Sequence, residues 1–197
     1  GSRVHGPRDH SRSRQRGAFV TERDTRLLCA ILFAVLVAFA QIVRADDATV
    51  LVLSQSMVAE GQFHGEADHA AVAAVLYRRA RQRGVTLAVM CERYVSALRK
   101  RGDRYVVNTP RAKWIRGLHL DASQPAAWPA NQSWAVNAPR WLAVIERARA
   151  SIAGTLADPC PRADHWGSPQ DVRWRGLEVV ACAVPMKNIF YRLERTR

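Results

Sequence analysis

The sequence lacks the short motifs that most readily identify a class of enzyme. It has no Gly-rich phosphate-binding loop, no Cys-x-x-Cys pair and no internal repeat, so the classes that depend on these patterns lose their support. Acidic residues are also scarce: 17 Asp and Glu stand against 30 Lys and Arg, giving a formal net charge of +13. This charge favours an anionic partner, such as nucleic acid, an anionic lipid surface or an acidic cell wall, but does not choose among them.

Length and hydrophobic content predict one domain. The chain has 197 residues, of which 48% are hydrophobic, enough for one sizeable core and too few for two ordinary domains. Residues 1–26 form a basic leader, expected to be disordered or to result from a wrongly assigned start. Residues 27–45 are mostly apolar and end like a signal-peptide cleavage site. We therefore expect a domain over residues 46–197 that is exported to the periplasm or secreted, with membrane contact only if the segment over 27–45 stays uncleaved.

The sequence contains four cysteines, and their positions are compatible with export. Cys29 lies inside the apolar segment and is lost if that segment is cleaved. In an oxidising compartment we expect Cys160 and Cys182 to form a disulfide, which would leave Cys91 as a buried thiol.

Two helices are predicted around the turn that follows Glu60. Apolar residues from Leu51 onward can line a helix that runs to Glu60, with Gly61 as its stop. A second helix is expected from near Gly65 to Gly84.

Three further features are expected along the rest of the chain. A third apolar-periodic stretch spans residues 87–98, and residues 105–107 could form a short strand. The region over 118–137 reads as an irregular loop. The run Asn137-Ala138-Pro139 is expected to cap a helix that ends at Gly154.

The stretch over residues 57–79, MVAEGQFHGEADHAAVAAVLYRR, resembles the opening of the spore-cortex-lytic type of cell-wall hydrolases. Ala59-Glu60 matches that family's Ala-Glu pair, the Ala/Val-rich run over 71–75 matches its helix, and Arg79 matches its closing arginine. Arg78 replaces the asparagine of the family pattern.

The resemblance continues near the other end of the domain. His165-Trp166-Gly167 is similar to an aromatic-containing turn, and residues 187–191, with Asn188 and Tyr191, are similar to the family's closing segment. The family's Gln-Phe-Ser-like motif has no clear counterpart between residues 100 and 117. The resemblance implies a mostly α (α+β), lysozyme-like domain that cleaves the glycan strands of peptidoglycan, with Glu60 as the catalytic acid.

Chemistry supports Glu60 independently. Cleaving a glycosidic bond requires a carboxyl group that stays protonated near neutral pH, and burial at the end of an apolar helix favours that state. The alternative is a solvated helix-terminal glutamate. Glu66 and Asp68 are the nearest candidates for a second carboxylate, although both also fit as acids in the first turn of a helix. Without a second carboxylate, the lytic-transglycosylase reaction is preferred over hydrolysis by a muramidase.

The remaining candidates concern binding. His165 and Trp166 could contact a sugar, or could pack beneath the expected disulfide, and Tyr105 could line a glycan cleft. His64 and His69 lie five residues apart without an evident third ligand, so neither a metal nor a cofactor is expected.

The expected partners are glycan strands and the anionic wall. Two rival hypotheses remain open: a non-catalytic wall- or glycan-binding protein, and an exported nucleic-acid-binding protein suggested by the arginines over residues 99–116. Export argues against the second, so no specific nucleic acid is expected.

Overall fold

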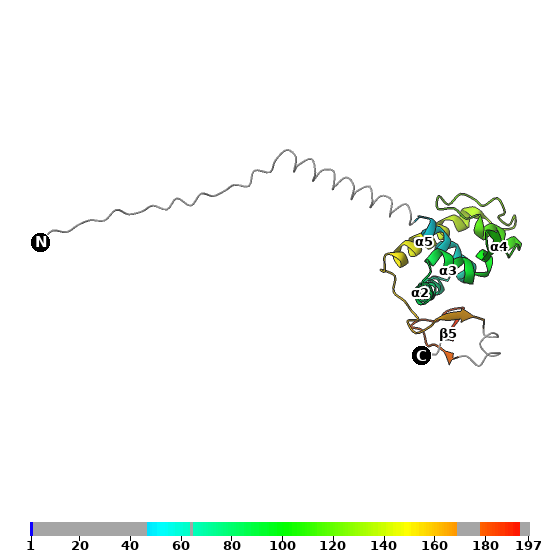
Figure 1. Ribbon diagram of the computed structural model, residues 1–197. Coiled ribbons are helices and arrows are strands. Elements are labelled where there is room, and N and C mark those ends of the chain that lie inside the picture. The colour runs from blue at the N-terminus through cyan, green and yellow to red at the C-terminus, as the bar shows by residue number, and fades with distance from the viewer. Residues whose placement is uncertain (2–46, 64, 169–177, 194–197) are drawn as a thin grey trace. The chain divides into compact units, whose positions relative to one another are not determined.

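The computed structural model describes Gly1 and residues 47–63, 65–168 and 178–193. Chain contacts separate a first unit, Gly1–Ile42, from a second, Val43–Arg197, and every helix and strand below belongs to the second. Beyond Gly1, the leader over 1–26 and the signal-like segment over 27–45 lie outside the described residues. Figure 1 gives the order of the elements along the chain.

The two helices expected around Glu60 are both present. The first is described over residues 47–61, and it buries one face with Leu53 and Met57. The second, α2, spans Glu66–Arg83 and ends at Gly84, whose φ of 60° is the left-handed conformation that glycine adopts readily. Alanines and valines dominate the buried face of α2, so the neighbouring helices can approach it closely.

The third apolar stretch forms a helix that is interrupted. Helix α3 spans Leu87–Tyr94 and is capped at its start by Thr86, whose side chain accepts the N–H of Val89. Val95 has an extended backbone, and a short 3₁₀ helix, η1, follows at Ser96–Leu98. The predicted single stretch over 87–98 is therefore two elements.

Between η1 and the irregular loop lie a hairpin and a short helix. Strands β1 (Lys100–Arg101) and β2 (Arg104–Tyr105) pair antiparallel. The strand predicted over residues 105–107 therefore overlaps the observed strand only at Tyr105. Helix α4 spans Pro110–Arg116 and was not predicted. Its signal was present in the sequence, because Thr109 caps the helix and Pro110 occupies the first turn.

The long helix α5 spans Trp134–Ile152, and its predicted start was wrong. The run Asn137-Ala138-Pro139 does not cap this helix, because Pro139 lies inside it. Tertiary contacts explain the earlier start: Trp134 packs on Trp128 at a ring-centroid distance of 4.8 Å, and its indole N–H donates to the carbonyl of Ala122 at 3.0 Å. Ser133, a residue type favoured at N-caps, stands directly before this turn, but its side chain makes no capping hydrogen bond, so these tertiary contacts stabilise the turn.

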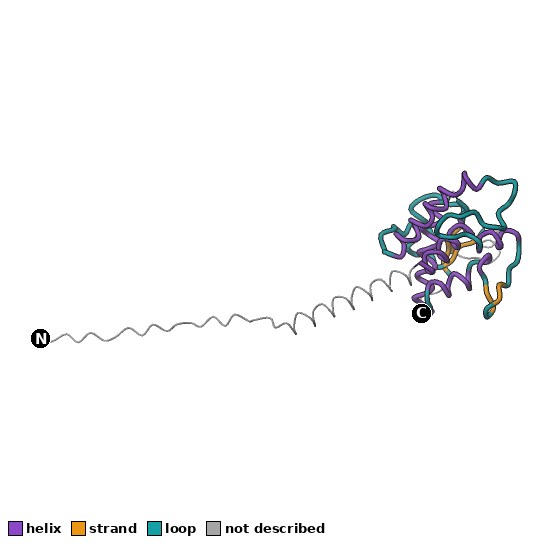
Figure 2. The backbone as a smooth tube through the Cα atoms, turned by 90° about the horizontal axis from the view of Figure 1, so that it is seen from above, coloured by secondary structure: helices purple, strands orange, loops and turns teal. Residues whose placement is uncertain are grey.

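The C-terminal part contains a three-stranded antiparallel sheet in the order β3-β5-β4. Strand β3 spans His165–Gly167, β4 spans Glu178–Val179 and the central β5 spans Ile189–Arg192. In Figure 1 the helices lie together with this small sheet on one side of them, and in the view of Figure 2 its strands overlap the helices. The fold is therefore mostly helical with small antiparallel sheets, as the sequence predicted at this coarser level.

Cysteine pairing follows the sequence expectation. Cys160 and Cys182 form a disulfide with a Cα–Cα distance of 4.6 Å, and Cys91 is a buried free thiol. Burial raises the pKa of the Cys91 thiol to about 12, which keeps it in its unreactive protonated form. Within the described part of the chain, no helix combines the length and apolar character that crossing a membrane requires.

Candidate functional site

Glu60 lies in the last turn of the first described helix and lines a cavity of about 400 Å³. Three other residues singled out in the sequence line the same cavity: His165, Trp166 and Asn188. The structure thus brings together residues that are more than 100 positions apart in the chain. Arg79, Tyr94 and Arg99 also line this cavity, although none of them was predicted from the sequence to take part in a glycan site.

The carboxyl group of Glu60 is positioned to hold a proton. Burial raises the pKa of Glu60 above its ordinary value, because the charged form loses solvation. Two groups act against this effect: the indole N–H of Trp166 donates to Oε2 at 3.1 Å, and the positive charge of Arg111 also favours the ionised carboxylate. The net direction is upward, so Glu60 remains a proton donor at a higher pH than a solvated glutamate.

His69 packs against the turn that follows Glu60 and forms a hydrogen bond with it. A Cβ at Gly61 would lie 2.6 Å from Cδ2 of His69, so only glycine fits there. The Nε2–H of His69 donates to the carbonyl of Gln62 at 2.6 Å, and Gln62 itself has a φ of 56°. Burial lowers the pKa of His69 and thereby favours the neutral ring that this contact uses. The helix end that carries Glu60 is therefore fixed by close packing.

In the sequence, His69 and His64 supply at most two ligands of a metal site. His64 lies outside the described residues, and Nε2 of His69 is occupied by the Gln62 carbonyl. Across the ranges that the structure describes, no group of three or more His, Cys, Asp or Glu side chains is arranged to hold a metal ion.

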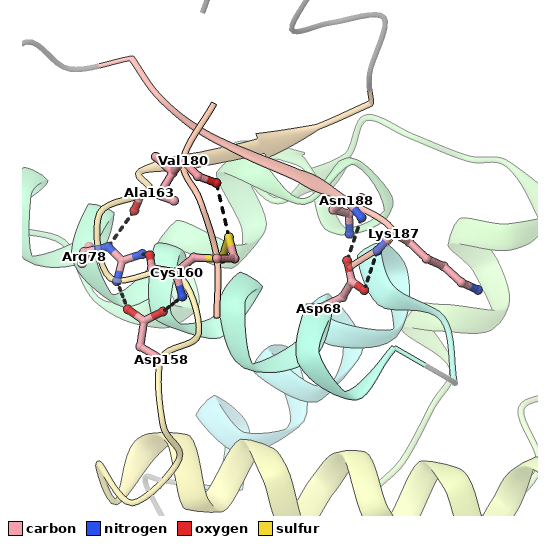
Figure 3. Close-up of a disulfide and its surroundings, with 9 residues drawn as sticks. Asp68, Arg78, Asp158, Cys160, Ala163, Val180, Lys187 and Asn188 are labelled. Carbon is pink, nitrogen blue, oxygen red and sulfur yellow. Dashed lines mark hydrogen bonds and ion pairs between the residues drawn. A yellow bond between two sulfur atoms is a disulfide. The ribbon is translucent and has the colours of Figure 1, made fainter. Parts of the chain in front are cut away.

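Asp68 is a structural acceptor in this geometry. Its buried carboxylate accepts the backbone N–H of Lys187 at 3.1 Å and that of Asn188 at 2.8 Å (Figure 3). The side-chain amide of Asn188 in turn donates to the backbone carbonyl of Glu60 at 3.3 Å. Asp68 therefore ties the segment before β5 to the start of α2 and brings Asn188 to the helix end that carries Glu60.

Glu66 points elsewhere. It is exposed and forms an ion pair with Arg147 on α5. Among the described residues that line the Glu60 cavity, Glu60 is the only carboxylate. Neither Glu66 nor Asp68 lines that cavity.

A polar network behind the cavity orients His165. Arg79 is 1% exposed, and it donates to the carbonyl of Asp164 at 3.1 Å, to Nε2 of His165 and to the hydroxyl of Tyr94. Because Nε2 accepts from a guanidinium, Nδ1 of His165 carries the proton and donates it to Oδ1 of Asp164 at 2.6 Å. The sequence showed Arg79 only as part of a family pattern, since nothing local indicates that it reaches β3.

Two of the binding residues expected from the sequence, Tyr191 and Tyr105, do not line the cavity. Tyr191 is buried on β5 and stacks against the ring of His165, with centroids 5.6 Å apart. Tyr105 is 47% exposed on β2, and its ring lies 4.1 Å from the guanidinium carbon of Arg116. Tyr191 thus supports His165, whereas Tyr105 belongs to the exposed hairpin.

The disulfide region carries Trp166 toward Glu60. Arg78 of α2 donates to the carbonyls of Ala163 (2.8 Å) and Cys160 (3.0 Å) and pairs with Asp158 (Figure 3). These contacts hold the segment that leads directly into β3. Arg78 therefore has a structural role.

No protein-family model, curated protein or solved structure matches this chain. The resemblance to cell-wall hydrolases of the spore-cortex-lytic type, and the lysozyme-like fold that it implies, consequently stay predictions.

Proposed function

We propose that this protein is a cell-wall enzyme that cleaves the glycan strands of peptidoglycan, with Glu60 as its catalytic acid and a lysozyme-like fold. The proposal rests on the position of Glu60 and on its raised pKa. Glu60 lies at the end of an apolar helix, and burial raises its pKa. It also lines a cavity whose other lining residues are polar and aromatic. Glycosidic cleavage requires a proton donor next to a surface that can bind a sugar.

A single carboxylate supports the lytic-transglycosylase reaction. Glu60 donates its proton to the glycosidic oxygen as the bond from that oxygen to C1 of muramic acid breaks. The C6 hydroxyl oxygen of the same sugar then bonds to C1, and its proton passes to the Glu60 carboxylate. The products are a 1,6-anhydro end and a free hydroxyl, and no water is consumed. No second acid is needed, in keeping with the structural contacts of Glu66 and Asp68.

Trp166 and Asn188 prepare Glu60 for this double role. The indole N–H of Trp166 fixes one carboxyl oxygen, and Asn188 holds the backbone of the same residue. Because Trp166 favours the charged form while burial favours the neutral form, the two states are brought closer in free energy than burial alone would allow. A group that gives and then takes a proton benefits from this balance.

The cellular location belongs to the same proposal. The Cys160–Cys182 disulfide is compatible with an oxidising compartment, and we propose that the protein is periplasmic or secreted. The excess of basic residues, 22 Lys and Arg against 14 Asp and Glu in residues 46–197, would hold the domain on the anionic wall, an attraction that salt weakens.

Digestion of purified murein tests the proposal. Chromatography with mass spectrometry should show muropeptides ending in 1,6-anhydro-muramic acid, lighter by one water than those with reducing ends. Mainly reducing ends would indicate a hydrolysing muramidase with Glu60 still as the acid. If wild type released no soluble product, the enzyme proposal would be wrong, and glycan binding without cleavage would replace it.

A further inference from the structure

A second cavity is lined by the residues two positions before and two positions after Glu60 in the chain. It has a volume of about 440 Å³ and is lined by Val58 and Gln62 from the helix end and the turn after it, and by side chains from α4 and from the α5 region. Neither Trp166 nor His165 contributes to it. This cavity therefore needs an explanation separate from the chemistry at Glu60.

One wall of the second cavity is aromatic. Phe63 and Trp114 stack with ring centroids 6.0 Å apart and an interplanar angle of 22°. Five tryptophans fall in the described residues, and four of them donate their indole N–H to a protein oxygen: Trp128, Trp134, Trp141 and Trp166. Trp114 has no such acceptor within the described chain. An aromatic face with an unused donor suits a sugar, which presents C–H groups and acceptor oxygens together.

Arg111 supplies the charge of this cavity. One guanidinium nitrogen donates to the carbonyl of Ala59 at 2.6 Å, which fixes the side chain beside the helix end. Within the described residues, no carboxylate pairs with Arg111, and its other N–H groups remain available. The amide side chains of Gln62, Gln132 and Asn137 line the same space. A guanidinium fork with open donors is the usual protein partner of a carboxylate.

We infer that this second cavity binds the carboxylate-bearing substituent of a muramyl sugar, with Arg111 on the carboxylate and Trp114 against the sugar or its acetamido group. The inference rests on the proposed function, because it identifies which part of the glycan strand the enzyme recognises. Two sources can supply the carboxylate: the lactyl group itself, when no peptide is attached, or the acidic residues of the peptide stem.

Arg111 is also within electrostatic reach of Glu60. A carboxylate bound to Arg111 would offset the positive charge that favours ionised Glu60. Occupation of the second cavity would therefore favour the protonated, active form of the acid, so that recognition and proton donation are coupled.

Binding to the full chain carrying Glu60→Gln tests this inference without cleavage. Three soluble ligands are compared by calorimetry: a murein tetrasaccharide with its peptides, the same tetrasaccharide stripped of peptides, and chitotetraose, which has no carboxylate. Chitotetraose should bind most weakly. Adding Arg111→Gln should weaken binding of the acidic ligands by about 10- to 100-fold and leave chitotetraose nearly unchanged. Lys113→Gln is the matched control, because it removes one positive charge from α4 outside the cavity.

The pattern of results separates the inference from the proposed function. A preference for the peptide-bearing ligand over the stripped one assigns the stem as the source, and equal binding of these two assigns the lactyl group. Equal affinity for all three ligands, or an equal loss with Lys113→Gln, would overturn the inference while leaving cleavage by wild type intact. Trp114→Phe should weaken all three ligands while retaining the wild-type melting temperature, and unchanged binding would contradict the part assigned to Trp114.

Discussion

The helical body and the C-terminal region over residues 158–193 hold their parts of the site by different forces. The helical body positions Glu60 through apolar packing, with Leu53, Met57 and Val58 fully buried in the helix that carries it. The C-terminal region supplies Trp166 and Asn188, but few apolar side chains are buried among its described residues, 158–168 and 178–193. It depends instead on a disulfide and on hydrogen bonds to Arg78, Arg79 and Asp68.

This difference separates two tasks. The acid sits on a part of the molecule whose stability comes mainly from the burial of apolar side chains. The groups that adjust its charge sit on a part held by directional bonds to α2, which fix position more narrowly. Changes at Glu60 in the first region should therefore remove or alter the proton donor. Changes in the second region should alter the pKa and the position of that donor.

The largest effect is expected from Glu60→Gln. Murein cleavage should fall by at least about 10²-fold, because the proton donor is deleted while size is kept. Turnover is measured on purified sacculi, and circular dichroism should show an unchanged fold. A variant with near wild-type turnover would place the acid elsewhere.

The same variant should alter stability with a defined pH dependence. Because the folded-state pKa of Glu60 is raised above 4.5 by burial, ionised Glu60 destabilises the folded state once the pH exceeds the unfolded-state pKa, and the cost grows until the folded-state pKa is passed. The melting temperature of Glu60→Gln should match wild type below pH 4 and exceed it at pH 7. The opposite order at pH 7 would mean that Glu60 is stabilised as an anion.

Removing the disulfide tests the C-terminal region. The bond closes a loop with a sequence separation of 22, and the double change Cys160→Ser with Cys182→Ser should lower the free energy of unfolding by about 3 kcal/mol. Urea denaturation measures the loss. Reduced wild type should behave in the same way, and Cys91→Ala should keep its sensitivity to reductant, since Cys91 is outside the bond.

Asp68 and Glu66 provide a matched pair of acids. Asp68→Asn should cost about 2 kcal/mol, because two backbone N–H groups lose a charged acceptor in a buried site. Glu66→Gln should cost less than about 1 kcal/mol, because its ion pair with Arg147 is exposed at the Glu66 end. Thermal unfolding and murein turnover are measured together for both variants. A loss of turnover in Glu66→Gln without loss of stability would identify it as the second carboxylate of a hydrolase.

The smallest change concerns the pH profile of Trp166→Phe. The indole N–H lowers the pKa of Glu60 from the value that burial would give, so its removal should move the alkaline limb of kcat/KM to higher pH. The position of the limb is the informative quantity, because the height also reflects any contact of Trp166 with the sugar. A limb that stays in place, or moves to lower pH, would mean that Trp166 does not act on the acid.

Local signals predicted much of the helical body. The helix to Glu60, the limits of α2 at Gly65 and Gly84 and the cysteine pairing all follow from periodicity, glycine and compartment. The start of α5 was missed although Ser133, a residue type favoured at N-caps, stands directly before Trp134. Its side chain makes no capping hydrogen bond, and the contact of Trp134 with Trp128 depends on tertiary structure. Helix α4 was missed although Thr109 and Pro110 signal its start, so that omission was avoidable.

The sequence by itself determined where the candidate acid lies, because an apolar period followed by Glu60 and Gly61 places a carboxyl group at a buried helix end. Only the tertiary structure decided its surroundings. Trp166 lies 106 positions away and Asn188 lies 128 positions away along the chain, and Asp68 becomes an anchor only when the segment before β5 meets the start of α2. Helix ends follow from short-range backbone and burial preferences, whereas the partners of a buried charge depend on which distant segments the core brings together.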